Sequence, residues 1–197
     1  MKSLIQENFE NNGTINFEPV FKMLNNELLK INELLELVCA GGYVMQLHGY
    51  RGTADVDAFY KSNNIIDGII KKVGDEFGIN KPDELWLNNS ILNMNPDPPD
   101  DCCEIVHQYP NLTVKAVDMT YLIGMKLISA RGQDLMDVAD IIKNSKDIQP
   151  FELLARLNGL KFEIDISIML DAFERAYGME WLDKFYRENE SELLKYY

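Results

Sequence analysis

The chain has 197 residues, of which 46% are hydrophobic and 26% charged, as is ordinary for a globular protein. Its formal net charge of −13 disfavours non-specific binding to nucleic acid, because the phosphate backbone attracts lysine and arginine. No apolar run approaches the roughly 18 residues of a membrane span, and the first residues lack the apolar core of a secretory signal. We therefore expect a cytoplasmic protein that does not enter membranes.

The first half of the chain is predicted to alternate between helices and strands. Apolar residues about 3.6 positions apart predict a helix over residues 17–37, after a turn at residues 11–13. A short apolar strand then ends at a glycine pair. The segments that follow are a brief helix over 43–50, a strand over 53–60, a helix over 64–77 and a short helix over 84–94.

The second half of the chain is predicted to turn from strands to helices. Residues 95–101 are rich in proline and aspartate, which predicts an exposed loop, and a strand pair follows over 103–109 and 112–117. The remaining predicted segments are helices over 119–131, 134–145, 150–158, 165–177 and 179–195. This order predicts an α+β (mixed α/β) fold. We place a core domain at residues 1–146 and a helical extension packed on it at 147–197, and the two could count as one domain.

Two aspartates in the stretch Ala-Asp-Val-Asp-Ala form the first candidate site. Side chains alternate along a strand, so Asp55 and Asp57 are predicted to share one face. Two close anions repel each other unless a cation lies between them, and a divalent metal ion would serve. The alternative is a solvated strand face, whose charges discourage aggregation.

Gly41 and Gly42 end the preceding strand. Glycine allows close approach of the backbone to a ligand, and successive amides in such a turn can bind phosphate oxygens. The alternative is a plain tight turn. Arg51 and Thr53 precede the aspartates and could bind a phosphate or orient a carboxylate, although either could also be an ordinary surface residue.

Lys126 is the second independent signal, because residues 119–130 contain no other charge. Such a helix is expected to be buried, and a buried lysine needs a partner. Either the Lys126 side chain extends to water, or it points into an anionic site. Gly132 is predicted to end this helix, and Asp134 could either cap the next helix or act in catalysis.

These residues together resemble the nucleotidyltransferase superfamily of the DNA polymerase beta type. The chain is most similar to small bacterial members related to the AbiEii abortive-infection toxins. The resemblance rests on the glycine pair, on Arg-Gly-Thr-Ala-Asp-Val-Asp at 51–57, and on Lys-Leu-Ile-Ser-Ala-Arg-Gly-Gln-Asp-Leu-Met-Asp at 126–137. It covers roughly residues 15–137 and implies a nucleotidyltransferase-type mixed sheet flanked by helices.

The resemblance implies that a nucleoside monophosphate moves from a nucleoside triphosphate to an acceptor hydroxyl, with release of pyrophosphate. Asp55 and Asp57 would bind Mg²⁺, with Mn²⁺ as an alternative, and Lys126 would neutralise the departing pyrophosphate. Active members have a third carboxylate on a neighbouring strand, for which Glu104 is the best-placed candidate. The residues implied in nucleotide binding are Gly41, Gly42, Arg51, Thr53, Lys126, Arg131 and Asp134.

The resemblance also implies partners. The chain could be the toxin of a toxin–antitoxin or phage-defence pair, with an antitoxin protein as its partner. The acceptor could be RNA, protein or a small molecule. A second hypothesis is a catalytically weak relative that binds nucleotide as a regulatory module. A purely structural domain would leave the paired aspartates and Lys126 unexplained.

Overall fold

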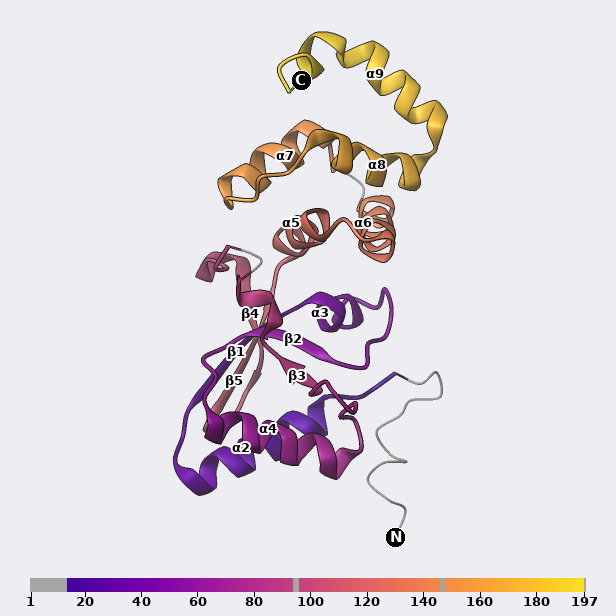
Figure 1. The fold of residues 1–197 in the computed structure, drawn as a ribbon. Helices are drawn as coiled ribbons and strands as arrows, with labels where there is room; N and C mark the ends of the chain where they lie inside the picture. The colour runs from indigo at the N-terminus through magenta and orange to yellow at the C-terminus, as the bar shows by residue number, and fades with distance from the viewer. Residues whose placement is uncertain (1–13, 94–95, 146–147, 197) are drawn as a thin grey trace. The chain divides into compact units, whose positions relative to one another are not determined.

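The computed structural model describes residues 14–93, 96–145 and 148–196, and has the predicted mixed α+β fold (Figure 1). Its contacts divide the chain into two compact units, one ending at Asp118 and one beginning at Met119. We predicted the boundary after residue 146, whereas the contacts place it after residue 118. Among the described residues, no helix is both long and apolar enough to cross a bilayer.

The first unit is a five-stranded mixed sheet with helices, in the strand order β3-β2-β1-β5-β4. β1 pairs in parallel with β5 and antiparallel with β2. The elements of this unit are α2 (Glu18–Ile31), β1 (Leu35–Ala40), α3 (Gly41–Leu47), β2 (Val56–Phe59), α4 (Asn64–Phe77), β3 (Leu87–Asn88), the 3₁₀ helices η1 (Ser90–Asn93) and η2 (Asp100–Cys102), β4 (Cys103–Gln108) and β5 (Leu112–Val117).

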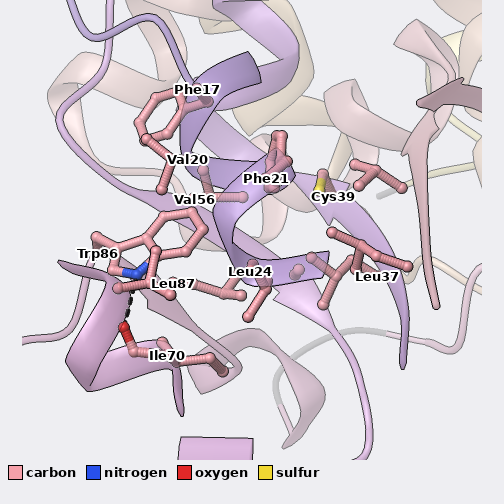
Figure 2. Packing of buried hydrophobic residues seen from close by; sticks show 14 of the residues in the cluster. Phe17, Val20, Phe21, Leu24, Leu37, Cys39, Val56, Ile70, Trp86 and Leu87 are labelled. Atoms are coloured by element: carbon pink, nitrogen blue, oxygen red, sulfur yellow. Dashed lines mark hydrogen bonds between the residues drawn. The ribbon is translucent and has the colours of Figure 1, made fainter. Parts of the chain in front are cut away.

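One face of this sheet packs against α2 and α4 to form the core. Alternate residues of each strand point into it, so Leu37 and Cys39 of β1 lie with Val56 of β2 among the helix side chains (Figure 2). The opposite face carries the residues between them. On that face, Lys115 of β5 binds Glu36 of β1 with 3.1 Å between the ammonium and a carboxylate oxygen.

The prediction of a helix over residues 84–94 was wrong. The segment forms the short strand β3 and the 3₁₀ helix η1, and Met94 lies outside the described residues, as does the turn predicted at 11–13. Trp86 explains the difference. Its side chain is 1% exposed and its backbone carbonyl accepts a hydrogen bond from the Val56 amide at 2.7 Å, which pairs the segment with β2.

Trp86→Phe should lower the free energy of unfolding by about 1–3 kcal/mol. The indole Nε1–H donates to the Ile70 carbonyl at 2.9 Å (Figure 2), so phenylalanine would remove this buried side-chain hydrogen bond and leave a small cavity. Urea denaturation followed by circular dichroism measures the loss. Trp181→Phe is the control, because Trp181 is partly exposed and should lose less. Equal losses would contradict a stabilising role for the buried Trp86 indole and its hydrogen bond.

The second unit is helical throughout its described residues. Its helices are α5 (Met119–Ser129), α6 (Gly132–Asn144), α7 (Pro150–Gly159), α8 (Ile166–Tyr177) and α9 (Met179–Leu193). Gly124 lets the ring of Phe162 lie against α5, since a Cβ there would come within 2.5 Å of that ring. The unit's buried side chains include those of Tyr121, Leu122, Val138, Ile142, Leu157, Phe162 and Phe173.

Candidate functional site

The glycine turn at the end of β1 lies directly beside Asp57. Antiparallel pairing sets Ala40, the last residue of β1, opposite Asp57 on β2. Gly41 follows with φ of +59°, in the left-handed region that favours glycine. A Cβ at Gly41 would lie 2.6 Å from Asp57 Oδ2. Only glycine therefore lets the chain pass this carboxylate so closely.

The second glycine lies against the loop that precedes β2. A Cβ at Gly42 would lie 2.5 Å from Thr53 Oγ1 and 3.5 Å from Nη1 of Arg51. The Thr53 hydroxyl donates to Asp55 Oδ1 at 3.1 Å. The structure thus brings together six of the residues predicted from sequence, which we call the glycine–aspartate site: Gly41, Gly42, Arg51, Thr53, Asp55 and Asp57.

The two aspartates are positioned differently from the prediction. We expected both on one strand, but β2 begins at Val56, and Asp55 lies in a bend before it. Both residues are partly exposed. Asp57 is placed by strand pairing, whereas Asp55 is placed by its side-chain partners, Thr53 and Lys81.

Gln46 of α3 holds the loop before β2 in place. Its amide group donates to the Ile15 carbonyl at 2.8 Å and accepts from the Thr53 backbone N–H at 2.9 Å. Gly52 of the same loop lies against Thr14, since a Cβ there would be 2.5 Å from Thr14 Oγ1. Sequence reasoning missed Gln46, because a lone glutamine on a short helix carries no recognisable signal.

Two further residues at the site were not among the predicted ones. Lys81 donates to Asp55 Oδ2 at 3.0 Å and to Glu84 Oε2 at 2.7 Å. These hydrogen bonds, that to Glu84 first, raise the pKa of Lys81 above its usual range, so it is an ammonium at neutral pH. Asn88 of β3 pairs in register with Asp57, and its Oδ1 accepts from both the N–H and the hydroxyl of Ser90.

The strand register places Glu104 away from Asp57. Glu104 pairs with Ala116 on β5, and Ala116 pairs with Cys39 on β1, so these three side chains share one sheet face. Asp57 pairs with Ala40, the neighbour of Cys39, and successive residues of a strand point to opposite faces. Glu104 is therefore on the opposite face of the sheet from Asp57.

β5 does not present a carboxylate on the face that carries Asp57. The residues of β5 on that face are Thr113, Lys115 and Val117. Lys115 occupies the middle of this row and is paired with Glu36 and Asp100. The third carboxylate of active nucleotidyltransferases thus has no counterpart on this face of β5.

The glycine–aspartate site fits a metal ion that arrives with phosphates better than one held by protein alone. Within residues 14–93, 96–145 and 148–196, no three or more histidine, cysteine or acidic side chains are grouped as a metal site. Mg²⁺, however, is commonly bound by one or two carboxylates together with substrate phosphates. Asp55 and Asp57 could supply the carboxylates, and the backbone at Gly41 lies directly beside the second of them.

Lys126 lies in a buried ion cluster of the second unit. The residue is 4% exposed, and its ammonium donates to Asp134 Oδ1 at 3.0 Å and to Asp137 Oδ2 at 2.5 Å. Ser129 donates to the other oxygen of Asp134, and Gln133 donates to the other oxygen of Asp137. The expectation that this lysine has an anionic partner is thus met by carboxylates of the next helix.

Asp134 does not cap α6, so that alternative was wrong. α5 ends at Ser129, followed by Ala130 with φ of +49°, and α6 begins at Gly132 with Arg131 as its N-cap residue. Asp134 therefore lies inside the first turn, where its carboxylate reaches Lys126 and Ser129. The predicted roles of Lys126, Arg131 and Asp134 in nucleotide binding remain predictions.

Comparison of the chain with protein-family models, curated proteins and solved structures yields no match. The resemblance to nucleotidyltransferases therefore remains a prediction from the sequence motifs.

Proposed function

We propose that this chain binds a nucleoside triphosphate with Mg²⁺ at the glycine–aspartate site and transfers its nucleoside monophosphate to an acceptor hydroxyl. The observation that carries the proposal is the close approach of Gly41 to Asp57 and of Gly42 to Thr53. A bare backbone beside a carboxylate is the arrangement in which a phosphate and its metal ion can be held together.

Each residue of the site has a role in this proposal. Asp55 and Asp57 would hold Mg²⁺, which when bound stabilises charge on the transferring phosphoryl group. The backbone at Gly41 and Gly42 would lie along the triphosphate. The guanidinium of Arg51, beside Gly42, would add positive charge to a chain whose net charge of −13 otherwise repels the nucleotide.

In the transfer, the acceptor oxygen bonds to the α-phosphorus, and the bond from that phosphorus to pyrophosphate breaks. The hydroxyl proton passes to water, because both site carboxylates would be occupied by the metal ion. The acceptor is RNA, a protein or a small molecule, and the resemblance implies an antitoxin as a protein partner.

A second candidate function is metal-dependent nucleotide binding without efficient transfer. The position of Glu104 on the opposite sheet face favours it, because a third carboxylate near the metal ions would be missing. Such a chain would act as a binding or regulatory module.

Incubation with labelled nucleoside triphosphates, Mg²⁺ and cell extract should label an acceptor, and Asp57→Asn should abolish the labelling. Asp75→Asn is the matched control, because Asp75 is an exposed carboxylate on α4 paired with Lys71. Expression in a bacterial host tests the toxin role, since wild type should arrest growth and Asp57→Asn should not.

The outcomes separate the two candidates. Metal-dependent nucleotide binding without transfer would support the second function over the first. If Asp55→Asn and Asp57→Asn both bind nucleotide and metal as wild type does, the glycine–aspartate site is not the binding site.

A further inference from the structure

The ammonium of Lys81 lies between two carboxylates at the edge of the glycine–aspartate site. It donates to Asp55 Oδ2 at 3.0 Å and to Glu84 Oε2 at 2.7 Å. The side chains of Lys81 and Glu84 are about half exposed, whereas that of Asp55 is 26% exposed. One ammonium group is thus shared between a site carboxylate and an outer carboxylate.

The backbone holds this arrangement in place. Lys81 and Glu84 bridge each other across a tight turn, with the Lys81 N–H donating to the Glu84 carbonyl at 2.9 Å. Two residues later, the Trp86 carbonyl accepts from the Val56 amide, next to Asp55. The turn is therefore fixed beside the start of β2, and Lys81 reaches Asp55 across 26 positions of sequence.

Both oxygens of Asp55 already accept a hydrogen bond, so a metal ion that binds there competes with one of the two donors. Oδ1 accepts from the Thr53 hydroxyl, and Oδ2 accepts from Lys81. Lys81 is the donor that can leave at least cost, because it keeps Glu84 as a partner and its charge stays paired. A divalent ion carries twice the charge of the ammonium and competes for the same oxygen.

We propose that Lys81 is the resident cation of Asp55, and that a divalent ion binding at Asp55 and Asp57 displaces it onto Glu84. This inference rests on the proposed function, since it takes Asp55 as a metal-binding carboxylate. Lys81 would then lower the affinity of the site for free metal and keep Asp55 in place until the metal arrives.

Mn²⁺ binding measured by electron paramagnetic resonance tests the proposal without any activity assay. Lys81→Gln should bind Mn²⁺ roughly three- to tenfold more tightly than wild type. Lys71→Gln is the matched control, because Lys71 is an exposed lysine paired with Asp75 on α4 of the same unit. It should bind as wild type does. Unchanged or weaker binding by Lys81→Gln would overturn this inference but not the proposed function.

A second pair of variants separates displacement from a general effect of charge. Glu84→Gln should weaken Mn²⁺ binding, because Lys81 would lose the carboxylate that receives it. In the Lys81→Gln background the same change should have little effect, and an equal effect in both backgrounds would overturn the proposal. If neither wild type nor Lys81→Gln binds Mn²⁺, the metal site of the proposed function fails as well.

Discussion

Lys126→Met should lower the free energy of unfolding of the helical unit by about 3–5 kcal/mol. Methionine keeps the length of the side chain but removes the ammonium, and Asp137 is only 1% exposed. A carboxylate held in such surroundings without the ammonium of Lys126 carries a larger desolvation cost. Urea denaturation followed by far-ultraviolet circular dichroism measures the change.

Two further variants test whether this loss of stability comes from the buried ion cluster. Lys184→Met removes a lysine whose side chain is 72% exposed, and should change the stability by no more than about 0.5 kcal/mol. Lys126→Met combined with Asp137→Leu should recover part of the loss, because apolar side chains can replace a buried ion pair. If Lys126→Met cost no more than Lys184→Met, the ion cluster would not stabilise the unit.

The sequence was most informative where local signals and packing agree. The helix predicted over residues 64–77 is α4, because Asn63 caps its first amides and Gly78, with φ of +65°, ends it. The strand predicted over 112–117 is β5, whose apolar residues alternate into the core. The prediction for residues 84–94 failed because pairing with β2 and burial of Trp86 outweigh the helical pattern. Neither effect can be recognised from the local sequence.

The same distinction applies to the candidate site. The glycine pair and the aspartates could be recognised because they are close in sequence, and strand pairing brings Gly41 to Asp57. Lys81 could not be recognised, since its contact with Asp55 depends on a turn fixed by β3. The orientation of Glu104 depends on register across three strands, which spacing along the chain does not reveal.

Gly41→Ala should weaken metal binding at the glycine–aspartate site by roughly 10–100-fold, the range for changes beside a metal ligand. The new Cβ would lie 2.6 Å from Asp57 Oδ2, so the carboxylate must move away from the turn. Alanine at a φ of +59° should also cost about 1–2 kcal/mol of stability. Calorimetric titration with Mn²⁺ and a non-hydrolysable nucleoside triphosphate measures the binding.

Gly49→Ala separates the two effects of the substitution. Gly49 has a φ of +75°, but a Cβ there would meet nothing within 4 Å. Both variants should therefore lose similar stability, because both place alanine in the left-handed region, and only Gly41→Ala should lose binding. Equal binding by Gly41→Ala and Gly49→Ala would mean that the position of Asp57 beside the turn does not affect ligand binding. Loss in Gly41→Ala alone would tie ligand binding to the 2.6 Å approach between one backbone position and one carboxylate.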